Sequence, residues 1–213
     1  MPRIPVLVIG KSGTGKSAAL RGMNPEKVSL INVLGKPLPF KEGTKFKSYT
    51  CDDPTKIESA IALAKTDIIV VDDAGFTMTN QFMKNHANAG GGNAVFQLFN
   101  QIGDSFWHMI EESRAGNDNK RIYFLMHEEM NDFGMTKPKS IGKMIDEKVC
   151  LEGMFTIVLR CMFHDGKHVF RTQTDGSDVT KSPMGMFKDF EIDNDLQLVD
   201  DTICDYYGIG KGE

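Results

Sequence analysis

The chain has 213 residues, of which 40% are hydrophobic and 25% are charged. That length suits one well-packed domain with a modest appendage and excludes two full-sized enzymatic domains. The formal net charge of −4 argues against a surface that is basic throughout, although a local basic face would not show in that total. The cysteines are widely spaced, which favours a reducing compartment. They are Cys51, Cys150, Cys161 and Cys204.

No stretch of the sequence approaches the roughly 20 consecutive apolar residues that a membrane-spanning helix needs. The apolar run near the N-terminus is short and is interrupted by Gly10, so it does not have the form of a secretory signal. We therefore expect a soluble cytoplasmic protein with no membrane association.

The hydrophobic pattern predicts strands that alternate with helices. Short apolar runs rich in β-branched residues indicate buried strands, and apolar residues at helical spacing indicate amphipathic helices. In chain order we expect strands over residues 5–9, 28–33, 46–50, 67–73 and 121–126, and helices over residues 16–22, 54–64 and 93–113. Asp53 is the expected cap of the second helix.

The last third of the chain has a different pattern. Residues 130–140 are polar and are expected to form an irregular loop. Residues 155–163 and 167–172 are expected to form a β-hairpin, because Asp165-Gly166 suits a tight turn. Residues 189–205 are acidic but carry apolar residues at helical spacing, which predicts a docked C-terminal helix.

Alternating strands and helices predict an α/β fold, with an open, mostly parallel sheet and helices on both faces. We expect a single domain over residues 1–213, in which residues 150–213 form a hairpin, loop and helix appendage. Ligands of such sheets bind at the carboxyl ends of the strands. The segments that carry chemistry all lie at that edge.

A complete phosphate-binding motif, G-x-x-x-x-G-K-[ST], follows the first predicted strand. Its glycines let backbone N–H groups surround phosphate oxygens. Lys16 is expected to reach the β- and γ-phosphates, and the Ser17 hydroxyl to ligate Mg²⁺. The sequence therefore predicts a site for ATP with Mg²⁺. The expected nucleotide-binding residues are Gly10, Lys11, Ser12, Gly13, Thr14, Gly15, Lys16, Ser17 and Ala18.

Two carboxylates close the apolar strand of residues 67–73. Asp72 is expected to hold Mg²⁺, and Asp73 is the candidate general base that activates water. His127 ends another buried strand and could contact phosphate or the attacking water, although a structural role is equally compatible with its position. Glu128 and Glu129 are alternative bases.

Weaker patterns leave their alternatives open. Cys161, His164 and His168 have the spacing of metal ligands but straddle the predicted hairpin and lack a fourth ligand. Lys181 stands beside a flexible, methionine-rich segment, which suits either a trans-acting cation toward a neighbouring subunit or a local loop packed on its own domain. A group of basic residues suits either nucleic-acid contact or a solvated face. Its members are Lys137, Lys139, Lys143, Lys148, Arg171, Lys181 and Lys188.

Several segments together resemble the small RecA-like, AAA-annotated ATP-binding proteins of bacteriophages, some of which are grouped with single-strand-annealing recombinases. The resemblance is carried by GKSGTGKS at residues 10–17, SLINVLGKPLPF at 29–40, DIIVVDD at 67–73, IGKMIDEKVCLEGMFTIVLR at 141–160 and TKSPMGMF at 180–187. It implies a RecA-type ATPase core, Mg²⁺-dependent ATP hydrolysis, a homo-oligomer, and a role with single-stranded DNA and other phage recombination or replication proteins in the host cytoplasm. Asp73 departs from the glutamate that many related ATPases have.

Two other functions compete with a DNA-linked ATPase. An ATP-gated adaptor or loader would use the acidic C-terminal segment and the methionine-rich loop for a partner protein. A small-molecule kinase would need an acceptor pocket and usually an arginine-bearing lid, whereas residues 130–140 contain lysines and no arginine.

Overall fold

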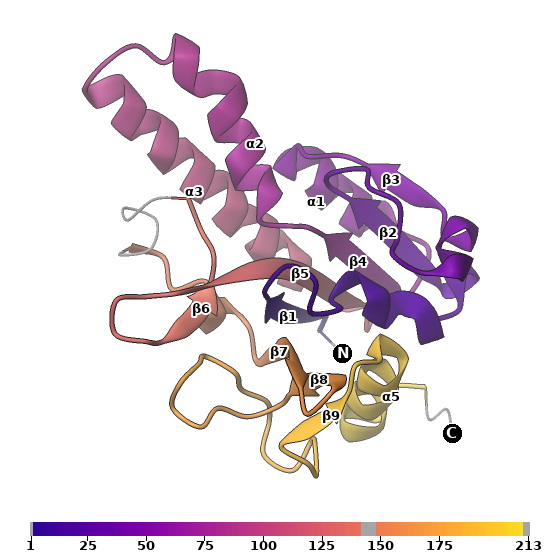
Figure 1. The fold of residues 1–213 in the computed structure, drawn as a ribbon. Coiled ribbons are helices and arrows are strands. Elements are labelled where there is room, and N and C mark those ends of the chain that lie inside the picture. The colour runs from indigo at the N-terminus through magenta and orange to yellow at the C-terminus, as the bar shows by residue number, and fades with distance from the viewer. Residues whose placement is uncertain (1, 142–147, 211–213) are drawn as a thin grey trace.

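The computed structural model describes residues 2–141 and 148–210. Its centre is a nine-stranded sheet in the order β3-β2-β4-β5-β1-β7-β8-β9, with β6 paired to β5 (Figure 1). The strands are β1 (Ile4–Gly10), β2 (Val28–Asn32), β3 (Ser48–Thr50), β4 (Ile68–Asp72), β5 (Arg121–Met130), β6 (Thr136–Pro138), β7 (Ile157–His164), β8 (Lys167–Arg171) and β9 (Glu191–Asp193). The α-helices are α1 (Pro54–Leu63), α2 (Phe76–Asn85), α3 (Asn93–Arg114) and α5 (Leu196–Tyr207).

The six strands from β3 to β7 are parallel, and β8 and β9 continue the sheet antiparallel. β1 is central, because it pairs with β5 on one side and β7 on the other. The carboxyl ends of β1, β4 and β5 therefore meet at one edge. The predicted α/β class and the mostly parallel sheet are confirmed.

Helices cover both faces of the sheet. Leu7 and Ile9 of β1 pack in one core cluster with residues of α1, α2 and α3. The alternate residues Val6 and Val8 pack in a second cluster with the segment after the phosphate motif and with α5. Because neighbouring side chains of a strand point to opposite faces, β1 contributes to both cores.

Several predicted elements are confirmed with small changes of boundary. The Asp53 carboxylate accepts hydrogen bonds from the backbone N–H of Thr55 and Lys56, at 3.1 and 3.4 Å, and so caps α1 as expected. The β7–β8 hairpin turns at Asp165 and Gly166, whose φ angles of 48° and 79° are both positive, as a two-residue turn with the twist of a β-hairpin requires.

The segment after the phosphate motif was expected to be a helix over residues 16–22. It is instead a short 3₁₀ helix, Ser17–Gly22. The backbone is extended at Met23, and Pro25 begins the next 3₁₀ turn, so the chain leaves the helical conformation before a longer helix can form.

The predicted irregular loop over residues 130–140 is wrong. β5 continues to Met130 and pairs antiparallel with β6, and Met130 faces Thr136. The Asn131 side chain accepts hydrogen bonds from the backbone N–H of Phe133 and Met135, at 3.0 and 2.9 Å. This asparagine closes the tight connection, and the strands were missed because they leave the apolar core at residue 127.

Two further elements were not predicted. Residues 74–90 contain α2, which forms a helical hairpin with α3 that projects beyond the sheet (Figure 1). The ring of Phe82 in α2 stacks on Phe99 of α3 with centroids 5.1 Å apart. The expected helix over residues 189–205 is a strand followed by a helix, since β9 precedes α5 and Asp195 caps α5 at Gln197 with a 2.8 Å hydrogen bond.

A buried ion pair fastens α5 to the sheet. The guanidinium of Arg121 donates two hydrogen bonds of 2.9 Å to the Asp200 carboxylate, and the Tyr123 hydroxyl donates a third of 2.7 Å. The side chains of Arg121 and Asp200 are 7% and 4% exposed. Burial and the adjacent carboxylate raise the pKa of Tyr123, which therefore remains a hydrogen-bond donor.

We expect Asp200→Ala to lower the free energy of unfolding by about 3–5 kcal/mol, because it leaves the buried Arg121 charge without its partner. Chemical denaturation measures the difference. Asp201→Ala is the matched control, since the neighbouring Asp201 is exposed and should change stability by less than about 0.5 kcal/mol. Equal effects of the two variants would contradict a stabilising role for the buried pair.

Candidate phosphate and metal site

The phosphate motif forms a loop between β1 and the 3₁₀ helix, and two of its glycines are required by close packing. A Cβ on Gly10 would lie 2.5 Å from the backbone oxygen of Cys161 in β7. Gly15 has a φ of +105°, and a Cβ there would lie 3.0 Å from Oδ1 of Asn194. Larger residues at these two positions would displace the loop from the sheet.

The C-terminal appendage holds the middle of this loop. The carbonyl oxygen of Thr14 accepts a 2.7 Å hydrogen bond from Nδ1 of His168, which places the proton on Nδ1. The same oxygen is 3.1 Å from the Cys161 thiol, which also accepts a hydrogen bond from the Asn194 amide. Burial raises the pKa of Cys161 to about 11. The loop is thus supported by β7, β8 and the residue after β9.

The possible zinc ligands Cys161, His164 and His168 have other hydrogen-bond partners. Cys161 and His168 point to a backbone oxygen, and His164 lies 2.8 Å from the Glu191 carboxylate. Within residues 2–141 and 148–210, no group of three or more His, Cys, Asp or Glu side chains could hold a metal ion. The spacing of these residues reflects the hairpin and the support of the loop.

Lys16 lies buried beneath the loop. Its ammonium donates hydrogen bonds to the carbonyl oxygens of Gly10 at 2.7 Å and Lys11 at 2.9 Å. Burial lowers the pKa of Lys16, and the nearby carboxylates of Asp73 and Asp72 offset part of that effect. The sequence predicted the residue, while its hydrogen bonds across the loop are visible only in the structure.

Ser17 and Asp72 are brought together as the two motifs predict. The Ser17 hydroxyl donates a 2.8 Å hydrogen bond to Oδ1 of Asp72, 55 residues further along the chain. The same oxygen accepts a 3.1 Å hydrogen bond from the backbone N–H of Asp73. Burial and the neighbouring Asp73 carboxylate raise the pKa of Asp72. A hydroxyl and a carboxylate side by side are oxygen ligands of the kind that Mg²⁺ prefers.

Asp73 stands in a left-handed backbone conformation with a φ of 58°, which is uncommon for a residue other than glycine. Its Oδ2 is 2.6 Å from the ammonium of Lys36, and its Oδ1 is 3.6 Å from Nε2 of His127. Burial alone would raise the pKa of Asp73, but His127 and Lys36 outweigh burial and the pKa is lowered. His127 therefore adjoins the candidate base, and Lys36 is a site residue that the sequence reasoning missed.

The alternative bases have other partners. The Glu128 carboxylate accepts hydrogen bonds of 2.8 and 2.9 Å from the Arg160 guanidinium, and its side chain is 3% exposed. Glu129 lies 3.6 Å from Lys137 across the β5–β6 pair. Arg160 also contacts Asp178 at 3.3 Å. The sequence did not single out Arg160 as a site residue, and its partner is 32 residues away in the sequence.

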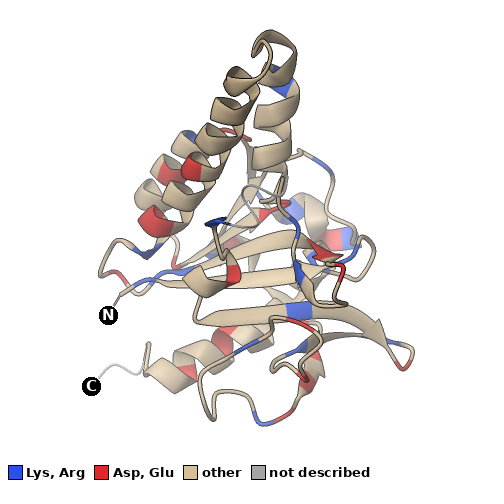
Figure 2. Ribbon diagram, turned by 90° about the vertical axis from the view of Figure 1, so that its left-hand side faces the viewer, with Lys and Arg blue, Asp and Glu red and all other residues tan. Residues whose placement is uncertain are grey.

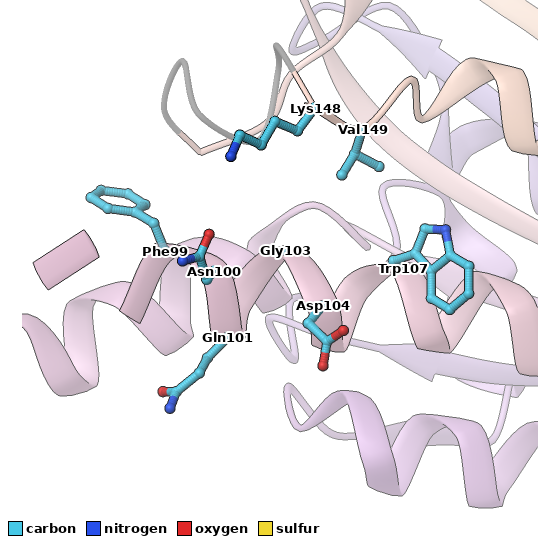
Figure 3. Close-up of a pocket in the computed structure, with 8 residues that line it drawn as sticks. All are labelled: Phe99, Asn100, Gln101, Gly103, Asp104, Trp107, Lys148 and Val149. Atoms are coloured by element: carbon cyan, nitrogen blue, oxygen red, sulfur yellow. The ribbon is translucent and has the colours of Figure 1, made fainter. Parts of the chain in front are cut away.

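A cavity of about 360 Å³ adjoins the loop on the side of His127. It is lined by Lys11, Ser12, Gly75, Phe76, Thr79, His127, Glu128, Lys139 and Ser140. A separate hollow of about 460 Å³ runs along α3, where Lys148 and Val149 face the helix (Figure 3). Its lining includes Phe99 and Trp107 and none of the predicted nucleotide-binding residues. The first cavity thus includes four residues that the sequence singled out for the site, which are Lys11, Ser12, His127 and Glu128.

Lys181, the possible trans-acting cation, lies on a segment that pairs with the sheet of its own domain. Lys181 exchanges two backbone hydrogen bonds with Val158 of β7, at 2.8 and 3.0 Å. Val158 pairs with Leu7, three residues before the phosphate loop begins. The segment of Lys181 is therefore fixed along the sheet.

Lys143 of the predicted basic group lies outside the described residues.

Neither a scan against protein-family models nor a search of curated proteins matches this chain. Fold and site geometry together define an α/β protein whose phosphate-type loop and acidic strand end meet at one edge of a mostly parallel sheet. In the part of the chain that the structure describes, no helix combines the length and apolarity that crossing a membrane requires.

We expect Gly10→Ala to lower the free energy of unfolding by about 1–3 kcal/mol, because the new methyl group would collide with the backbone of β7. Chemical denaturation again measures the change. Gly91→Ala is the control, since a Cβ at Gly91 meets no atom within 4 Å. A Gly10 variant as stable as the Gly91 variant would show that the loop can move away from β7 at little cost.

Proposed function

We propose that this protein is a RecA-like P-loop ATPase that binds ATP with Mg²⁺ and hydrolyses it. The observation that carries the proposal is the 2.8 Å hydrogen bond between Ser17 and Asp72. Two sequence motifs predicted independently that these side chains share a metal ion, and the fold places them in contact. The insertion of β5 between β1 and β4 also brings His127 to the same edge.

The residues of the loop fit a triphosphate. Its positive-φ glycines, Gly13 and Gly15, permit the turn that directs backbone N–H groups inward. Lys16 exchanges its two carbonyl partners for phosphate oxygens when a nucleotide binds. Ser17 and Asp72 would hold Mg²⁺, which neutralises charge on the phosphates. These groups bind and orient the nucleotide.

Hydrolysis requires a base beside the terminal phosphate. Asp73 takes a proton from the attacking water in this proposal, and the phosphorus–oxygen bond to ADP breaks as the new bond to water's oxygen forms. The lowered pKa keeps Asp73 ionised at neutral pH. His127 contacts the same carboxylate and is suited to sense the terminal phosphate.

We expect purified protein to hydrolyse ATP only with Mg²⁺, and Lys16→Ala to reduce the rate at least about a hundredfold, since it removes a cation that stabilises the transferring phosphoryl group. Phosphate release measures the rate. Lys27→Ala is the control, because Lys27 is exposed at the opposite end of β2. Hydrolysis that survives in Lys16→Ala would argue against this site.

Substitutions of the two metal ligands should act through Mg²⁺. We expect Ser17→Ala and Asp72→Asn each to raise the Mg²⁺ concentration for half-maximal binding of a non-hydrolysable ATP analogue at least about tenfold. Calorimetric titrations at several Mg²⁺ concentrations test this, with the exposed Ser59→Ala as control. An unchanged Mg²⁺ requirement in both variants would remove Ser17 and Asp72 from the metal site.

The proposed role with single-stranded DNA, in a homo-oligomer with phage recombination or replication proteins, rests on the resemblance to bacteriophage proteins. Lys and Arg residues are interspersed with Asp and Glu over the fold (Figure 2). A DNA contact on such a surface would be local. Stimulation of hydrolysis by single-stranded DNA tests it, and a rate that DNA leaves unchanged favours the adaptor or loader, for which the 94% exposed Met184 offers a contact.

The cavity beside His127 also supports a second candidate function. Its volume of about 360 Å³ lies in the range of small-molecule sites. A kinase would place a hydroxyl acceptor there, next to the terminal phosphate. Transfer of labelled phosphate from ATP to a nucleoside or metabolite, in place of release to water, would establish that activity.

A further inference from the structure

Lys36 reaches the proposed active site from a loop that lies outside both the phosphate motif and the acidic strand end. The loop follows β2, and its backbone is attached to two strand ends. The Asn32 amide donates a 2.7 Å hydrogen bond to the carbonyl oxygen of Lys36, and the N–H of Val33 donates one of 3.1 Å to the carbonyl oxygen of Asp72. Gly35 turns the chain with a φ of +65°. The start of the Lys36 side chain is therefore fixed relative to β4.

The two partners of the Lys36–Asp73 ion pair differ in exposure. The Asp73 side chain is 6% exposed, whereas that of Lys36 is 59% exposed. Asp73 adjoins a second buried carboxylate, Asp72, and like charges so close repel one another. A cation placed on Asp73 offsets that repulsion, and the 2.6 Å distance to Oδ2 shows that Lys36 occupies this position.

Lys36 and His127 together contact both oxygens of Asp73. We propose that Lys36 is a positioning residue, which holds the Asp73 carboxylate in the orientation that activates water. The inference rests on the proposed ATPase function and deepens it. In this role Lys36 affects hydrolysis by orienting Asp73 and does not itself contact the phosphates.

Steady-state kinetics distinguish these two actions. We expect Lys36→Met to lower kcat about tenfold with little change in the KM for MgATP, because substrate binding is retained while the base is misplaced. Lys36→Arg should recover most of the rate, since it keeps a cation of similar reach. Lys41→Met is the control, as this exposed lysine lies five positions further on.

A double-mutant cycle provides the decisive comparison. If Lys36 acts through Asp73, the variant carrying both Lys36→Met and Asp73→Asn should be no slower than Asp73→Asn alone. Two effects that multiply, or a raised KM with unchanged kcat in Lys36→Met, would overturn the inference. A rate equal to that of the wild type in Lys36→Met would also overturn it.

The same experiment separates this inference from the ATPase proposal. Lys16→Ala is measured alongside the four members of the cycle, one of which is the wild-type protein. If hydrolysis depends on Lys16 but the effects of Lys36→Met and Asp73→Asn multiply, the positioning role of Lys36 is rejected and the ATPase proposal stands. No hydrolysis above that of Lys16→Ala rejects the ATPase proposal and, with it, the positioning role.

Discussion

The candidate site depends on burying two adjacent carboxylates at the end of a central strand. Asp72 and Asp73 are each exposed by 5% or less, and isolated charges in such surroundings are strongly unfavourable. The fold compensates each in a different way. Asp72 receives hydrogen bonds from Ser17 and from a backbone N–H, while Asp73 receives the charge of Lys36. Burial and the neighbouring Asp73 carboxylate nevertheless raise the pKa of Asp72, whereas His127 and Lys36 outweigh burial at Asp73 and lower its pKa.

Unequal pKa values within a carboxylate pair suit unequal roles. The hydrogen-bond donors to Asp72 are a neutral hydroxyl and a backbone N–H. Neither carries a positive charge that would offset the charge of the carboxylate. A divalent ion would supply that compensation. Asp73 already has its cation and needs no metal to stay ionised. Under the proposed ATPase function, this difference in environment fits Mg²⁺ at Asp72 and a role without metal contact for Asp73, the assignment that the order of the two residues predicts.

Sequence reasoning located the parts of this site that are contiguous in the chain. The phosphate loop is a local motif, and the strand before Asp72 is marked by four β-branched residues in succession. Because parallel strands end at one edge, the sequence also predicted that Ser17, Asp72 and His127 would lie near one another. Lys36 and Arg160 were missed as site residues, since their partners lie far away in the sequence and the segments that contain them entered only through the resemblance. The extension of β5, α2 and β9 were missed because little of them packs into the apolar core.

The C-terminal appendage belongs to the site as much as the strands do. Thr14 is held by Cys161 and His168, and Gly15 is packed against Asn194. The next residue, Asp195, caps α5, and the buried pair of Asp200 with Arg121 then fastens that helix to β5. One continuous series of contacts therefore runs from the phosphate loop through the hairpin and α5 back to the strand that carries His127. Because these contacts are continuous, a displacement of the loop would have to strain or shift the hairpin and α5 as well.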